Sequence, residues 1–87
     1  MFDYEKLPEH MREGMKLYVE EGIATGSFMN AVLENDLVHS FAYADEDNLA
    51  SMFEWAGFLH WELPTPAWGS KAKVNAWKKA GGIKANA

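Results

Sequence analysis

The stretch that decides the fold runs from Asp45 to Trp61 and has the sequence DEDNLASMFEWAGFLHW. Asp45 is a strong helix cap, because its carboxylate can accept hydrogen bonds from the free N–H groups of a first helical turn. The two acidic residues that follow it favour the positive end of a helix dipole. We therefore predict a long helix from Glu46 to about Trp61, with one apolar stripe facing the core. That stripe comprises Leu49, Met52, Phe53, Ala56, Phe58 and Leu59, and Trp55 and Trp61 widen it.

Three shorter helices are predicted before this one. The first extends from about Pro8 to Glu21, because proline suits a first helical turn and Gly22 is a typical helix end. Ser27 is expected to cap the second, and Asp36 a third that ends at about residue 44. The second and third helices are alternatively one kinked helix. Their apolar residues are Phe28, Val32 and Leu33, followed by Leu37, Val38 and Phe41.

A last helix is predicted after a proline-containing loop. Two prolines in residues 63–69 remove backbone donors and push the residues before them into extended conformations. Ser70 can cap a helix from Lys71 to Ala80, which Val74 and Trp77 would anchor to the core from one face. The glycines at positions 81 and 82 are expected to end it.

Composition and pattern together predict an all-α fold. The 87 residues include 48% hydrophobic residues and no cysteine, so packing alone must stabilise the protein, without disulfides. No segment alternates apolar and polar residues as a strand would, and no internal repeat is evident. We expect a compact single-domain bundle of four to five short helices over residues 1–82, with residues 83–87 as a frayed tail.

The sequence favours a cytoplasmic protein. No apolar run approaches the roughly 18 residues of a membrane span. The first residues lack the basic start and apolar stretch of a signal peptide. We therefore expect no membrane partner.

Charge is distributed unevenly along the chain, whose formal net charge is −5. Residues 3–62 carry all 13 carboxylates and only three basic side chains, and the remainder carries five lysines and no acid. A basic helix can pack against acidic helices of its own chain, or it can face a partner. A second copy of the chain could also bring the opposite charges together, so the oligomeric state stays open.

No catalytic, cofactor or metal site is predicted. His10, His39 and His60 are the only imidazoles, and none has a second histidine within the spacing of a zinc motif. The serines include no nucleophile-elbow pattern, and the glycines form neither a phosphate loop nor a dinucleotide fingerprint. We expect a protein that is not an enzyme.

The segment from Trp68 to Lys79 contains the residues that we single out for partner binding. Lysines on a short helix could contact phosphates, and an exposed tryptophan could stack on a base. Alternatively, the lysines are solvated or face the acidic helices. A different possibility is that the acidic helices imitate nucleic acid and occupy a DNA- or RNA-binding protein. The candidate residues are Trp68, Lys71, Lys73, Lys78 and Lys79.

Several short motifs occur together between Leu7 and Gly82. They are Gly26-Ser27-Phe28, Ala31-Val32-Leu33-Glu34-Asn35-Asp36-Leu37, Ala44-Asp45 with Asn48, Pro66-Ala67-Trp68-Gly69-Ser70 and Val74-Asn75-Ala76-Trp77. In these motifs the chain resembles a group of small proteins encoded by phages and prophages of proteobacteria, which have no assigned activity. The resemblance implies a phage-derived accessory protein and no particular reaction.

The leading functional hypothesis is a non-enzymatic accessory protein that binds and modulates a host or phage protein, as a host-takeover or anti-defence factor would. It rests on the missing catalytic constellation and on the many aromatic and methionine side chains, some of which would stay exposed as a contact patch. The alternatives are a nucleic-acid-associated module that uses the helix from Lys71 to Lys79, and an acidic nucleic-acid mimic.

Overall fold

The computed structural model describes residues 2–85 and is all-α over that range, with no strand. It contains seven α-helices, of which five have seven residues or more. This exceeds the predicted four to five, because the expected long helix is divided in two and a further short helix follows the basic one. The elements are η1 (Tyr4–Lys6), α1 (Glu9–Glu21), α2 (Ser27–Leu33), α3 (Leu37–Tyr43), α4 (Glu46–Ala50), α5 (Met52–Trp61), η2 (Thr65–Ala67), α6 (Lys71–Ala80) and α7 (Gly82–Ala85).

The predicted helix from Glu46 to Trp61 is interrupted at Ser51. Asp45 caps α4 as expected, since its side chain accepts from the N–H of Asn48 at 2.8 Å. Ser51 then leaves helical geometry, with φ −108° and ψ 16°, and its N–H turns back to the carbonyl of Asn48. Across the break, Trp55 Nε1 donates to Asn48 Oδ1 at 3.2 Å, so both buried polar groups have partners. The break changes the direction of the apolar stripe.

A tight turn separates α2 from α3, which settles the alternative of one kinked helix. Asn35 adopts a left-handed conformation with φ 62°, which asparagine tolerates better than most residues. Asp36 caps α3 as predicted, through a bond from the N–H of His39. Ser27 was expected to cap α2, but Gly26 occupies the cap position and no side chain bonds there.

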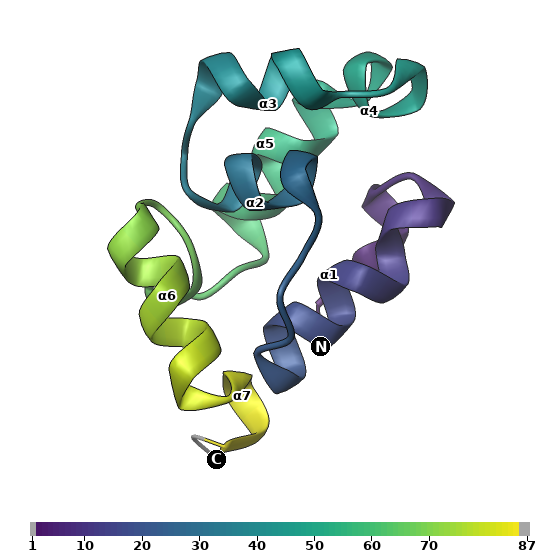
Figure 1. The fold of residues 1–87 in the computed structure, drawn as a ribbon. Coiled ribbons are helices and arrows are strands. Elements are labelled where there is room, and N and C mark those ends of the chain that lie inside the picture. The colour runs from purple at the N-terminus through teal and green to yellow at the C-terminus, as the bar shows by residue number, and fades with distance from the viewer. Residues whose placement is uncertain (1, 86–87) are drawn as a thin grey trace.

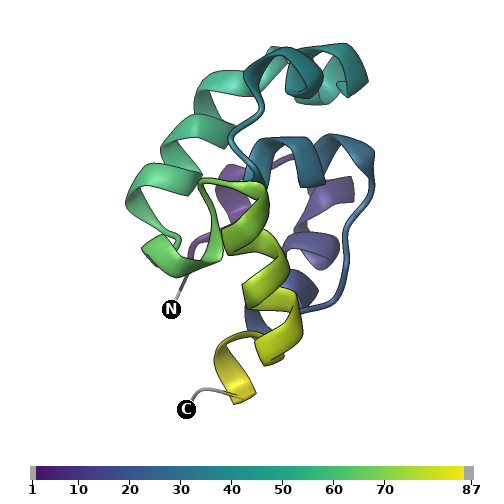
Figure 2. The same cartoon turned by 60° about the vertical axis from the view of Figure 1, so that its left-hand side comes forward.

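The helices form two groups around a shared core (Figure 1). Helices α3 and α4 lie together at one end, above α2 and α5, in Figure 1 and in the rotated view of Figure 2. Helices α1, α6 and α7 form the other end of the molecule. The largest fully buried side chains are Trp55, Tyr18, Phe58, Leu7, Met15, Leu33, Val19 and Val74.

The basic helix α6 is docked on the core, as the sequence predicted. Val74 and Trp77 are buried, and Ser70 caps the helix through the N–H of Lys73. Trp77 Nε1 also donates to the backbone carbonyl of Tyr18 in α1 at 3.1 Å. Tyr18 in turn donates its hydroxyl to the carbonyl of Ala67 at 2.6 Å, and burial raises the pKa of that hydroxyl. These two bonds fix the segment from η2 to α6 against α1.

The chain after α6 folds back onto the end of α1. Ile83, which the sequence assigned to a frayed tail, lies within α7 and packs partly buried against the core. Residues 86 and 87 of that predicted tail lie outside the described residues. Gly22 and Gly82 both have positive φ, and a Cβ added at Gly82 would meet backbone atoms of residues 20–22 at 2.6 Å. Only residues without a side chain allow the two backbones to approach so closely.

Candidate functional site

Large apolar side chains are exposed on α3 and α5, where the sequence predicted core positions. Phe53 is 88% exposed, Trp61 76% and Leu37 68%. Val38 and Phe41 in α3 are exposed as well, as is Leu49 in α4, so the prediction that these residues face the core is wrong. The reason is local: after the break at Ser51, α5 buries Trp55, Phe58 and Leu59 and presents the side of Phe53 and Trp61 to solvent.

An apolar groove of about 330 Å³ lies between α3 and α5. Leu37 and Phe41 line it from α3, and Phe53 lines it from α5. Buried side chains, Trp55 and Leu59, form part of its lining too. Such a groove matches the lower end of the volumes of small-molecule pockets, and it is wide enough for one or two side chains of a partner.

A second hollow, of about 340 Å³, is also lined by Phe53. Phe53, Gly57 and Trp61 line it, and they fall one helical turn apart on a single face of α5. Lys6 and Glu54 complete the lining. We call the combined surface of Leu37, Phe41, Phe53, Gly57 and Trp61 the α3–α5 face.

The charges beside the α3–α5 face are predominantly negative. Lys6 Nζ lies 2.8 Å from Glu62 Oε2, and this hydrogen bond lowers the pKa of the Glu62 carboxyl and raises that of Lys6. The positive charge at one end of the hollow is therefore already paired. Glu54 is exposed and makes no ion pair within residues 2–85.

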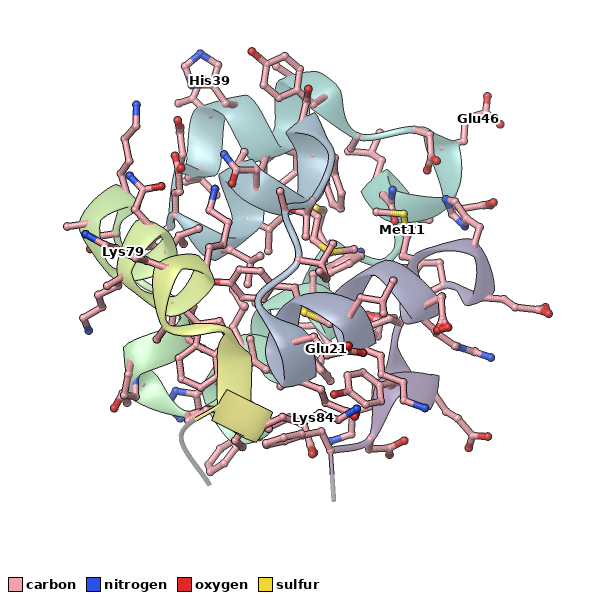
Figure 3. The ribbon with its side chains drawn as sticks, turned by 60° about the horizontal axis from the view of Figure 1, so that its bottom comes forward. Met11, Glu21, His39, Glu46, Lys79 and Lys84 are labelled. Atoms are coloured by element: carbon pink, nitrogen blue, oxygen red, sulfur yellow. The ribbon has the colours of Figure 1, made fainter. Side chains whose placement is uncertain are left out.

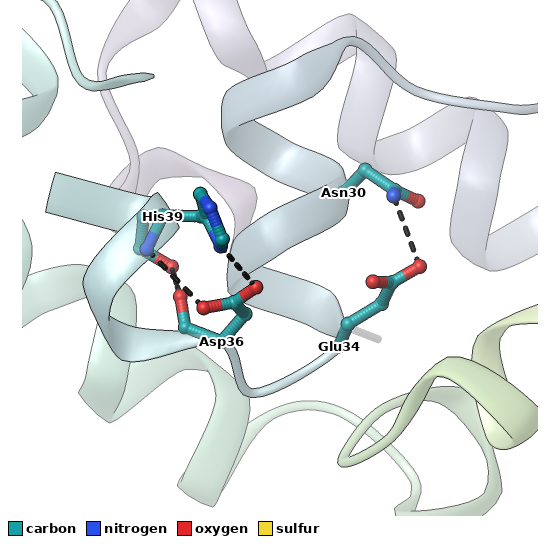
Figure 4. Close-up of polar contacts among 5 residues, drawn as sticks. Asn30, Glu34, Asp36 and His39 are labelled. Carbon is teal, nitrogen blue, oxygen red and sulfur yellow. Dashed lines mark hydrogen bonds and ion pairs between the residues drawn. The ribbon is translucent and has the colours of Figure 1, made fainter. Parts of the chain in front are cut away.

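A polar hollow on the outer side of α2 and α3 contains Asp36 and His39 (Figure 4). His39 Nδ1 lies 2.7 Å from Asp36 Oδ2, and Asn30 donates to Glu34 nearby at 3.0 Å. The bonds from His39 hold the pKa of the Asp36 carboxyl below its usual range. The His39 side chain is 57% exposed and that of Asp36 is 40% exposed, so both are open to water. The pair acts locally as a helix cap, with the His39 ring stacked on Tyr43.

Four of the five candidate residues on the basic segment are solvent-facing lysines. Lys71, Lys73 and Lys79 are exposed and Lys78 is partly so, and none forms an ion pair with the part of the chain that the structure describes. Lys79 points outward at the edge of the molecule in Figure 3. These lysines are not gathered on one strip, since Lys73 lies on the opposite side of α6 from Lys71 and Lys78.

The fifth candidate residue, Trp68, is only partly exposed and packs against the core. Its Nε1 is buried and has no hydrogen-bond partner among the described residues. Because Trp68 packs against the core with its Nε1 buried, it is less available for stacking on a base than the exposed lysines are for contacting phosphates.

One lysine does connect the basic and acidic parts of the chain. Lys84 Nζ lies 3.9 Å from Glu20 Oε1 and 3.7 Å from Glu21 Oε2, near the contact of α7 with α1 (Figure 3). The internal pairing that the charge pattern allowed is thus present at Lys84, and the α6 lysines take no part in it within residues 2–85.

Comparison with protein-family models, curated proteins and solved structures found no match to this chain. Within residues 2–85, no cluster of three or more histidine and acidic side chains is placed to hold a metal ion. No helix in that range is long and apolar enough to cross a membrane.

The sequence indicated that aromatic side chains would stay exposed, but it did not locate them. The apolar residues of α5 are distributed all round the helix, so periodicity could not separate the core side from the exposed side, and the sequence assigned all of them to the core. Ser51 is the one local signal for the break, because serine competes for backbone hydrogen bonds inside helices.

Proposed function

We propose that this protein is a non-enzymatic accessory protein that binds another protein through the α3–α5 face. The observation that carries the proposal is the continuity of that face: the groove and the hollow share Phe53 and bring apolar side chains of two helices together. Scattered exposed apolar residues are ordinary, whereas adjoining ones mark interaction surfaces.

Aromatic anchors supply most of the binding energy in many protein interfaces. Moving a side chain such as that of Phe53 from water into a partner contributes about 1.5–3 kcal/mol. Trp61 would add a similar amount, and the groove beside Leu37 and Phe41 offers a receptor for apolar side chains of the partner. Two aromatic anchors beside an apolar groove support a specific protein–protein contact with a small interface.

An enzymatic function has less support from the arrangement of polar groups. The best-defined polar pair, Asp36 and His39, is open to water and already serves a helix end. General acid–base catalysis usually relies on groups whose environment shifts their pKa values toward the working pH. The pKa of the Asp36 carboxyl is instead held below its usual range, away from neutral pH.

A host or phage protein is the partner that the sequence resemblance favours, and modulation of that partner is the proposed role. Binding through an apolar face can block a site or hold a conformation without any chemistry by the binder. A takeover or anti-defence factor would act in this way.

A second candidate function is association with nucleic acid through α6. It is favoured by the exposed lysines at positions 71, 73 and 79, which have no ion pair within the described chain. It predicts DNA or RNA binding that weakens steeply with salt. Lys73→Glu combined with Lys78→Glu would abolish such binding and leave the α3–α5 face intact.

Affinity capture with matched variants distinguishes these functions. Tagged protein would be incubated with lysate of the source cells in three forms: unchanged, Phe53→Ser with Trp61→Ser, and Lys78→Ala with Lys79→Ala. We expect a stoichiometric protein partner to be lost from the first variant and kept by the second. Retention by a folded Phe53→Ser, Trp61→Ser protein would contradict the proposal, and circular dichroism would establish folding.

A further inference from the structure

We infer that the partner places a cationic amphipathic helix on the α3–α5 face, with one of its large apolar side chains in the hollow above Gly57. The inference rests on the proposed protein-binding function and names the chemistry of the partner. Three observations carry it: an unexplained glycine, the shape of the face, and the charge around it.

Gly57 lies inside α5, where a glycine destabilises the helix relative to alanine. Its own fold gives no reason for that cost. A Cβ added at Gly57 would meet nothing within 4 Å, and the residue has no positive φ. Gly22 and Gly82, by contrast, are required by close backbone contacts. The missing side chain at Gly57 instead keeps the hollow between Phe53 and Trp61 open.

The shape of the face suits a helix better than an extended strand. One row along α5 consists of Phe53, Gly57 and Trp61. Its two ends are large exposed aromatic side chains, and the glycine between them leaves a hollow. Rows of this kind receive the side-chain ridges of a second helix. Within residues 2–85 there is no sheet edge to which a strand could add. The groove beside Leu37 and Phe41 would take the next apolar side chain of the same partner helix.

The charge of the surrounding chain selects a cationic partner. Residues 27–63, which contain α2 to α5, carry seven carboxylates and no lysine or arginine. Among them, Glu54 lines the hollow itself and forms no ion pair within the described range. Glu46 and Asp47 are exposed on the neighbouring helix α4, where Asp47 lines a different hollow beside Pro8 and His10. Glu46 points outward from α4 in Figure 3. Lysines and arginines on the polar face of a helix would complement this field and speed its association.

The same charges disfavour a second copy of this chain as the occupant. A two-fold dimer through the α3–α5 face would bring the same patch of each copy together. The Glu54 carboxylate beside the hollow would then face an equally acidic surface of the other copy, and like charges across an interface cost affinity.

Designed peptides test the inference directly. Three helical peptides of about 18 residues would be titrated into the full chain by calorimetry. One has leucine and phenylalanine at helical spacing with a lysine and arginine polar face, the second replaces every basic residue by glutamate, and the third scrambles the first. Gly57→Leu fills the hollow, and Ala72→Leu is its control, since it adds the same side chain to an exposed position of α6.

We expect the cationic stripe peptide to bind about tenfold or more tightly than the other two, with affinity falling as salt screens the charges. Gly57→Leu should weaken it by roughly tenfold and Ala72→Leu should leave it unchanged. Equal binding of the cationic and acidic peptides, an unchanged affinity of Gly57→Leu, or no binding of any peptide would overturn the inference. A dimer of the chain that Phe53→Ser dissociates in sedimentation would overturn it as well.

The outcome separates the inference from the proposed function. If the peptides fail while Phe53 and Trp61 are still needed to capture a cellular protein, the function stands and the cationic helix is wrong. If capture is also independent of Phe53 and Trp61, both are wrong.

Discussion

Phe53 and Phe58 belong to the same helix, yet Phe53 is 88% exposed and Phe58 is fully buried. Identical side chains on α5 therefore serve different purposes, one facing the core and one facing solvent. This contrast separates the residues that hold the fold from those that we assign to binding.

The first prediction uses this pair as its own control. Phe58→Ala should lower the free energy of unfolding by about 3–5 kcal/mol, because it leaves a cavity in the core. Phe53→Ala should change it by less than about 0.5 kcal/mol, as expected for an exposed position. Urea unfolding of both variants measures the difference. A large loss for Phe53→Ala would show that its side chain is packed in solution.

The second prediction concerns the backbone contact between α7 and the end of α1. Gly82→Ala should destabilise the protein by more than about 1 kcal/mol, because alanine is strained at φ +76° and its Cβ would collide with backbone at 2.6 Å. Gly57→Ala should instead stabilise it by roughly 0.5–1 kcal/mol, because α5 has open space there. Thermal unfolding would give midpoints on opposite sides of the unchanged protein. Equal midpoints for the two variants would refute the described docking of α7.

The third prediction tests the bond that spans the break at Ser51. Asn48→Ala would leave Trp55 Nε1 buried without an acceptor, at a cost of about 1–3 kcal/mol. Asn75→Ala, at an exposed position of α6, should cost less than about 0.5 kcal/mol. Chemical denaturation followed by tryptophan fluorescence compares them. Similar losses would mean that the Asn48 contact contributes little.

Three of the four helix caps predicted from the sequence are confirmed, because a cap depends on one residue and its next three neighbours; the fourth, Ser27, is wrong, since Gly26 occupies the cap position of α2. Asp36, Asp45 and Ser70 all cap the helices expected of them. The docking of α6 through Val74 and Trp77 was predictable for the same kind of reason, since one helical face carries both.

The α3–α5 face was not predictable from periodicity. Leu37, Phe53 and Trp61 are apolar residues of predicted helices, and the turn at Asn35 and the local break at Ser51 leave them outside the core. The sequence left open whether the candidate lysines on α6 face solvent or the acidic helices, and it could not show that Trp68 packs partly buried beside them.

A fourth prediction follows from the carboxylate of Asp45. The backbone bond from Asn48 is the main cause that holds its pKa below the ordinary 3.8, and the side-chain bond from His10 adds to it. A depressed pKa in the folded state stabilises the protein above the unfolded value and loses that contribution as pH falls through the folded value. Stability should therefore decline below about pH 4.

Asp45→Asn supplies the comparison, because asparagine also caps helices but does not titrate. Its unfolding free energy should depend less steeply on pH between about 4 and 2 than that of the unchanged protein. Parallel slopes in this range would show that Asp45 does not contribute through its charge.

The central claim is that the α3–α5 face is the surface that binds another protein helix. Titration of isotope-labelled protein with the cationic amphipathic peptide, followed by backbone amide chemical shifts, tests it most directly. We predict that the largest shifts occur at Phe41, Phe53, Gly57 and Trp61, with little change from Lys71 to Lys79. Largest shifts along α6, or changes of equal size throughout the chain, would contradict the account.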